Sequence, residues 1–135
     1  MPLEDVTLAF APGHRPAAAA LALIADANER IDRFVRSHRG EPITGFVASD
    51  YTMVDSALAQ IRDQRLATGD LFCEWGSGFG VVVGLAGLLG YASHGIEAHR
   101  ELTDQSRDLL EDHHIEATLA HGSMVPEDGD GLVDE

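Results

Sequence analysis

The sequence predicts an α/β protein that contains half of a doubly wound parallel sheet, in strand order 3-2-1, behind two N-terminal helices. From residue 70 onward, strand-like and helix-like patterns alternate, which favours parallel strands joined by right-handed crossovers. Three glycines at alternate positions, Gly76 to Gly80, follow the first of these strands. The chain has 135 residues, enough for one modest domain with a core of its own.

The N-terminal half is predicted to hold two helices. The first covers residues 16–38, where Pro16 suits a first helical turn and apolar residues recur at helical spacing. Its predicted inner face consists of Leu21, Ile24, Asn28, Ile31, Phe34 and Val35. The second helix covers residues 52–66, and Asp50 is its predicted N-cap.

Three strands follow, at residues 71–75, 91–97 and 115–121. The first reads LFCEW, and because its apolar residues are consecutive we expect both of its faces to be buried. Cys73 and Trp75 are accordingly expected to pack in the interior. The third strand alternates apolar and polar residues, which places it at or near an edge of the sheet.

Two helices connect these strands. Residues 80–89 are apolar on nearly all sides, which predicts a buried helix. Residues 99–113 are amphipathic, which predicts a helix with one solvent-exposed face. The histidines of this region, His99, His113 and His114, lie on or beside the exposed face, so a metal site is not expected there.

The composition excludes several kinds of chemistry. The formal net charge is −14, and all nine basic residues are arginines. Without lysine the chain can form neither a lysine Schiff base nor a phosphate-binding loop of the Gly-Lys-Ser/Thr kind. Non-specific binding to nucleic acid depends on neutralising phosphates, so this acidity disfavours a nucleic-acid partner.

The sequence also bears on location. It contains no run of 18 or more apolar residues, and its acidic N-terminus lacks the basic segment of a secretory signal. Cys73 is the only cysteine, so no internal disulfide can form. We therefore expect a cytoplasmic protein with no membrane partner.

The glycine turn has a physical interpretation. In a doubly wound sheet, ligands bind outside the carboxyl ends of the strands, where this turn lies. Glycines let the backbone bend tightly and let a ligand approach it closely, and the helix that follows offers free N–H groups. Glu97, about 20 residues beyond Gly76, ends the second strand and can accept hydrogen bonds from a ribose diol. Together these features predict a nucleoside-containing cofactor.

The identity of the flanking residues favours one cofactor over another. The dinucleotide fingerprint is Gly-x-Gly-x-x-Gly, but here the position of its third glycine is Val81. Glu74, two residues before the first glycine, would repel a pyrophosphate and attract an ammonium or a sulfonium. The residues therefore favour S-adenosylmethionine over NAD.

The segment Glu74–Gly80 resembles the first motif of the class I S-adenosylmethionine-dependent methyltransferases, an acid followed by Gly-x-Gly-x-Gly. Gly95–Glu97 is similar to that family's second-strand acid. In Gly122–Met124, Ser123 stands where the family often has an aspartate before an adenine contact. Ser49–Thr52 is similar to a segment that folds over the cofactor, so the resemblance spans roughly residues 45–126.

This resemblance implies a Rossmann-like fold, S-adenosylmethionine as cofactor and a set of cofactor-binding residues. In the family's roles, Glu74 would hold the methionine ammonium and Glu97 the ribose hydroxyls. The backbone around Ser77 would line the methionine portion. Ala98 and Met124 would flank adenine, and Tyr51 and Thr52 would close over the cofactor. The implied set is Tyr51, Thr52, Glu74, Gly76, Ser77, Gly78, Gly80, Glu97, Ala98, Ser123 and Met124.

On this basis we expect four parts along the chain. Residues 1–14 form a flexible N-terminal segment, and residues 15–68 hold the N-terminal helices with their loop. Residues 69–126 form a half-domain that binds S-adenosylmethionine, and residues 127–135 form an acidic tail.

The family's domain continues with further strands, so this chain is expected to be a truncated form that lacks the acceptor-binding half. The first strand would then have an open edge, where we expect self-association or a partner chain. The methyl acceptor, a protein or a small molecule, stays open, and the missing half can leave the chain inactive. A non-catalytic cofactor-binding or association module is the alternative, and a NAD(P)-binding oxidoreductase is disfavoured.

Overall fold

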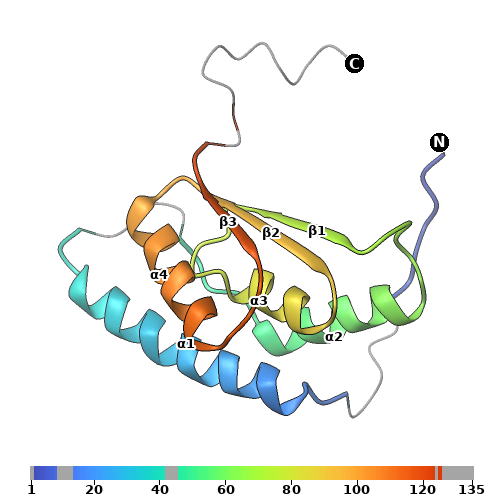
Figure 1. Ribbon diagram of the computed structural model, residues 1–135, viewed down its shortest axis with the longest axis horizontal. Helices are drawn as coiled ribbons and strands as arrows, with labels where there is room; N and C mark the ends of the chain where they lie inside the picture. The colour runs from blue at the N-terminus through green and yellow to red at the C-terminus, as the bar shows by residue number, and fades with distance from the viewer. Residues whose placement is uncertain (1, 9–13, 42–45, 124, 126–135) are drawn as a thin grey trace.

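Parallel pairing of three strands builds the sheet, which the computed structural model shows together with four helices (Figure 1). The structure describes residues 2–8, 14–41, 46–123 and 125. The strands are β1 (Leu71–Trp75), β2 (Ala92–Glu97) and β3 (Thr118–His121). Their spatial order is β1-β2-β3 and both pairings are parallel, so the predicted order 3-2-1 is confirmed. The chain is an α/β protein with a partial Rossmann-like sheet.

The four predicted helices are also present, with ends shifted by a few residues. They are α1 (Ala18–Ser37), α2 (Tyr51–Asp63), α3 (Val81–Leu88) and α4 (Arg100–Asp112). The predicted cap of α2 is confirmed, because the Asp50 carboxylate accepts a hydrogen bond of 3.1 Å from the Met53 N–H.

The helices cover one face of the sheet in two layers (Figure 1). Helix α3 packs against β1 and β2 on one side and against α1 and α2 on the other, so the prediction of a buried helix is confirmed. Its Gly84 allows this close packing, since a Cβ there would lie 2.7 Å from a methyl carbon of Leu110 and 2.8 Å from one of Leu23.

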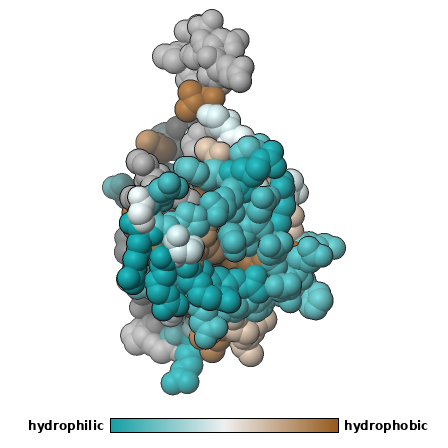
Figure 2. All heavy atoms as spheres, turned by 90° about the vertical axis from the view of Figure 1, so that its left-hand side faces the viewer, coloured by the Kyte–Doolittle hydropathy of each residue, from teal (hydrophilic) through white to brown (hydrophobic). Residues whose placement is uncertain are grey.

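Polar side chains tie α1 to both ends of α4. The His38 Nε2 lies 2.9 Å from a Glu101 carboxylate oxygen, and the His113 Nε2 lies 2.8 Å from Asp26. Arg30 bridges Asp26 and the Asp112 carboxylate, the latter at 2.6 Å. The side of the molecule where α1 ends and α4 begins is mostly hydrophilic (Figure 2).

The predicted inner face of α1 is wrong in part. Leu21 and Val35 are 50% and 49% exposed, and Asn28 is exposed as well. The stripe that meets the core consists of Ala20, Leu23, Ala27, Ile31 and Phe34. Close packing against α3 favours small alanines on this stripe, whereas the prediction followed the larger apolar residues.

The prediction that both faces of the first strand are buried is also wrong. Leu71 and Trp75 are 72% and 64% exposed, and Cys73 is exposed, so neither Cys73 nor Trp75 packs in the interior. The cause is topological. Both right-handed crossovers run in the same direction along the sheet, so α3 and α4 lie on the same face. The opposite face, which we call the open face, carries Leu71, Cys73 and Trp75.

Strands β1 and β3 are the two edges of the sheet in the described part of the chain. The edge position of β3 confirms the prediction from its alternating pattern. Pairing of the β1 edge with a second copy or a partner stays a prediction. The predicted acidic tail, residues 127–135, lies outside the described residues. Within the described ranges, none of the helices combines the length and apolar character needed to cross a bilayer.

Candidate functional site

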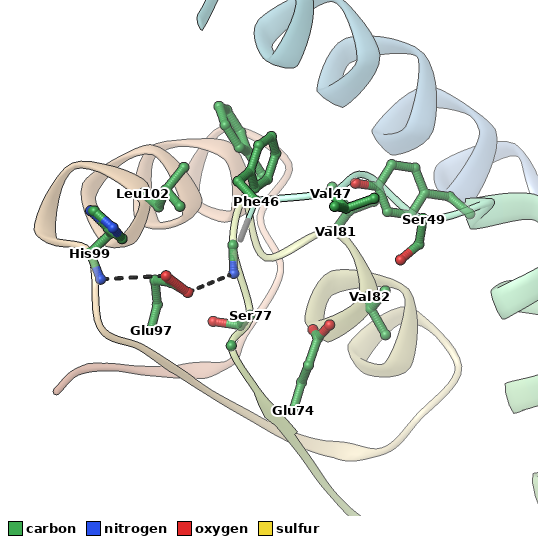
Figure 3. Close-up of a pocket in the computed structure, with 14 residues that line it drawn as sticks. Phe46, Val47, Ser49, Glu74, Ser77, Val81, Val82, Glu97, His99 and Leu102 are labelled. Carbon is green, nitrogen blue, oxygen red and sulfur yellow. Dashed lines mark hydrogen bonds between the residues drawn. The ribbon is translucent and has the colours of Figure 1, made fainter. Parts of the chain in front are cut away.

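A cavity of about 140 Å³ opens at the carboxyl ends of β1 and β2, beside the start of α3 (Figure 3). This volume is smaller than the roughly 300–1,000 Å³ of typical small-molecule sites. The cavity is lined by Phe46, Val47, Ser49, Tyr51, Glu74, Gly76, Ser77, Gly78, Phe79, Val81, Val82, Glu97, His99 and Leu102. The lining thus joins the loop before α2, the glycine turn and the start of α4.

The glycine turn forms one side of the cavity, and its shape requires glycine. Gly76, Gly78 and Gly80 have φ angles of 74°, 54° and 74°, in the left-handed region that other residues rarely adopt. At Gly80 a Cβ would also lie 2.8 Å from the Ser106 Cβ of α4. The turn therefore packs directly on α4 and exposes bare backbone to the cavity.

Main-chain hydrogen bonds fix the turn to the neighbouring strand. The N–H groups of Gly76 and Ser77 both donate to the Ile96 carbonyl, at 2.8 and 3.0 Å. Because Ile96 precedes Glu97, these bonds hold the turn and the second-strand acid in one rigid unit.

Glu97 is buried, and its two carboxylate oxygens each accept a backbone N–H. Oε2 accepts from Gly78 at 3.2 Å, and Oε1 accepts from His99 at 3.4 Å. These two hydrogen bonds fix the orientation of the Glu97 carboxylate. A carboxylate oxygen has two lone pairs, so Glu97 retains capacity for hydroxyl donors from a ligand.

Glu74 lies on the other side of Ser77 in Figure 3 and has a different environment. Its Oε2 is buried and has no hydrogen-bond partner among the described residues. Burial first, and then the charge of Glu97, raise the pKa of Glu74 to about 7, partly offset by the Val83 backbone N–H. The two acids of the cavity therefore differ in hydrogen bonding: both carboxylate oxygens of Glu97 accept a backbone N–H, whereas Oε2 of Glu74 has no donor among the described residues.

Ser77 is the third polar side chain between these acids. Its side chain is only 6% exposed, and its Oγ has no hydrogen-bond partner among the described residues. A buried hydroxyl without a partner costs roughly 1–3 kcal/mol, so this group is a candidate for a hydrogen bond with a ligand.

Aromatic and aliphatic side chains close the cavity from the helical side. The Phe79 ring packs edge-on against Phe34 of α1, with centroids 5.2 Å apart, and lies 5.7 Å from the Phe46 ring. Tyr51, the first residue of α2, is buried, and burial raises the pKa of its hydroxyl. This wall provides an apolar surface that suits a flat ring.

The structure brings six of the predicted cofactor-binding residues together around this cavity. They are Tyr51, Glu74, Gly76, Ser77, Gly78 and Glu97. Their roles toward a ligand stay predictions.

Four other predicted residues lie outside the lining. Thr52 and Ala98 are exposed, and Gly80 packs on α4. Ser123 accepts a hydrogen bond of 3.0 Å from the Val125 N–H. Met124 lies outside the described residues.

Several lining residues were missed from the sequence. His99 follows Glu97 by two positions, and that spacing was a usable signal because the strand end and the start of α4 meet there. Phe46 and Val47 lie in an irregular loop, whose position no periodic pattern reveals. In the part of the chain that the structure describes, no group of three or more His, Cys, Asp and Glu side chains is arranged to hold a metal.

Comparisons with known proteins add little about this site. No family model matches the chain, and a search of curated proteins gave no match. Among solved structures it is similar to tRNA (uracil-54, C5)-methyltransferase from Pyrococcus abyssi in complex with S-adenosyl-L-homocysteine, with a TM-score of 0.45 and 16% identity. The match covers 59% of this chain and 20% of that one, so this chain spans about a fifth of that enzyme's length. A likeness at this level shows nothing about a ligand or an activity of this chain.

Proposed function

We propose that the cavity binds S-adenosylmethionine and that the chain is the cofactor-binding part of a class I methyltransferase. One observation carries the proposal: bare glycine backbone at the ends of β1 and β2 lies between two carboxylates that line the same cavity. Glycine turns of this kind let a ligand contact the main chain directly, and strand-end acids can hold a ribose diol.

Glu97 is the proposed partner of the ribose. It ends β2, and the N–H groups of Gly78 and His99 fix the orientation of its carboxylate. Because each oxygen has a lone pair left, the two hydroxyls of one ribose can donate to it side by side. The partly exposed Phe46 ring, which packs on the buried Phe79, offers a surface for the adenine ring.

Glu74 and Ser77 are the proposed partners of the methionine end. The Glu74 carboxylate suits an ammonium group, and the unpaired Ser77 hydroxyl suits a carboxylate or a carbonyl. Among the described residues the lining contains no arginine, so a pyrophosphate would face two acids without a compensating guanidinium from them. The lining therefore supports an adenosine thioether better than NAD.

When bound, S-adenosylmethionine supplies an activated methyl group, so the protein needs mainly to align an acceptor with it. The residues of this chain would bind the nucleoside, fix the sulfonium between the acids and limit access of water. The acceptor, a protein or a small molecule, belongs to the proposal and is not defined by the described residues. A module that binds the cofactor without transferring its methyl group is the alternative.

Calorimetry tests the binding step. We expect heat on titration with S-adenosylhomocysteine and none with NAD. Heat with NAD alone would favour an oxidoreductase, and no heat with either would overturn the proposal. Transfer of a labelled methyl group into a cell extract then separates a methyltransferase from a module that only binds.

A further inference from the structure

The two acids of the cavity, Glu74 and Glu97, differ in the hydrogen-bond donors around their carboxylates. Both carboxylate oxygens of Glu97 accept a hydrogen bond from a backbone N–H group. The Glu74 Oε2 has no donor among the described residues, although it is buried. An ionised Glu74 would thus add a second negative charge to a cavity that already holds one.

The groups that face Glu74 come from every element around the cavity. Glu97 of β2, His99 at the start of α4 and Tyr51 at the start of α2 line the same cavity as Glu74. The Val83 N–H of α3 favours the ionised form of Glu74, but burial and the Glu97 charge outweigh it and raise the pKa to about 7. No arginine lines the cavity in the part of the chain that the structure describes, so no guanidinium from that part compensates the charge of Glu74.

We infer that Glu74 exchanges its proton for the ammonium group of the ligand, so that the site selects adenosine ligands that carry an ammonium through proton release. This inference rests on the proposed function and adds a specificity device to it. In the free protein a proton on Glu74 relieves the repulsion between the acids. A bound ammonium takes over that role, and the proton leaves to solvent. A neutral nucleoside cannot replace the proton.

The number of protons released on binding, and the change of affinity with pH, follow from the pKa of the exchanging group. For a group that titrates near pH 7, binding of a cation releases about half a proton at pH 7 and about a tenth of a proton at pH 8. The apparent affinity for a ligand that carries the ammonium then falls about tenfold between pH 8 and pH 6. A ligand that lacks the ammonium shows neither effect.

The test compares two probes that share the same nucleoside and sulfur. S-adenosylhomocysteine carries an ammonium, and 5′-methylthioadenosine does not. Calorimetry at pH 7 in buffers of different ionisation enthalpy measures the protons released by each. We expect about half a proton for S-adenosylhomocysteine and none for 5′-methylthioadenosine.

Variants locate the proton. Glu74→Gln should abolish the release, whereas Glu116→Gln, an exposed acid outside the cavity, should preserve it. Release that persists in Glu74→Gln would assign the proton to another group, such as His99, and overturn the inference.

A measurement on the free protein is independent of any variant. The side-chain carboxyl carbon of Glu74, followed by NMR between pH 4 and pH 9, should titrate near pH 7. Titration near the ordinary value of a glutamate, with ligand binding intact, would refute proton exchange and leave the proposed function standing. Failure of both probes to bind at any pH would refute the proposed function and the inference with it.

Discussion

Replacing Gly80 by alanine tests the geometry of the glycine turn without any ligand. The φ angle of Gly80 is 74°, where a side chain costs about 1–2 kcal/mol. The added Cβ would also lie 2.8 Å from the Ser106 Cβ, a contact that α4 can relieve only by moving. Overpacking of this kind costs about 1–3 kcal/mol. We therefore expect Gly80→Ala to lower the free energy of unfolding by about 2–5 kcal/mol.

Two other glycines provide matched controls. Gly90 has a φ angle of 94°, but a Cβ added there would have no neighbour within 4 Å, so Gly90→Ala should cost only the conformational strain, about 1–2 kcal/mol. Gly69 has neither a positive φ angle nor a near neighbour, so Gly69→Ala should be neutral or slightly stabilising. Urea unfolding followed by far-UV circular dichroism measures all three variants. Equal losses for Gly80→Ala and Gly90→Ala would refute the close packing of the turn on α4.

Three further predictions concern the two acids and the open face. Glu97→Ala should weaken binding of S-adenosylhomocysteine by about 1.5–3 kcal/mol, the scale of hydrogen bonds to a charged group, and unchanged affinity in calorimetry would refute the ribose assignment. The pKa of Glu74 is raised from 4.5 to about 7, so the native state binds the Glu74 proton more tightly than the unfolded chain does. The stability that this proton contributes is fully present below pH 4.5 and is lost as the pH rises through 7. Glu74→Gln should therefore have the same free energy of unfolding as the wild type at pH 4.5. At pH 8 the variant should be more stable than the wild type by about 1–2 kcal/mol, a value reduced for solvent screening of a half-buried group. Equal free energies of unfolding at pH 8 would contradict this prediction. Cys73 is exposed on the open face, so it should react with a thiol reagent in the native protein as fast as a free thiol, and reaction only after unfolding would show that this face is covered.

Much of the fold followed from local patterns in the sequence. The alternation of strand and helix after residue 70 predicted the parallel order, because right-handed crossovers leave few other arrangements. Helix α3 was predicted as buried from its apolar residues alone. Asp50 was predicted as a cap because aspartate is a common acceptor at helix N-termini.

The errors arose where burial depends on elements distant in the sequence. Consecutive apolar residues from Leu71 to Cys73 suggested two covered faces, but only the crossover direction decides which face the helices cover. On α1, side-chain size pointed to Leu21, whereas close packing on α3 selected Ala20 and Ala27.

The site was predictable where chemistry and local backbone geometry coincide. Gly76, Gly78 and Glu97 line one cavity with Glu74, as the spacing of glycines and acids indicated. The contribution of Phe46 was not predictable, because it depends on how an irregular loop packs against Phe79. The difference in hydrogen bonding between Glu74 and Glu97 was not predictable either, because it depends on where the folded backbone places its N–H donors.

The central claim is that the turn between the two acids receives an adenosine thioether, and a crystal structure of the chain soaked with S-adenosylhomocysteine tests it most directly. We expect the ribose hydroxyls within hydrogen-bonding distance of the Glu97 carboxylate and the amino group beside Glu74. A well-occupied ligand elsewhere on the protein, or a cavity that stays free of ligand at saturating concentration, would contradict the claim.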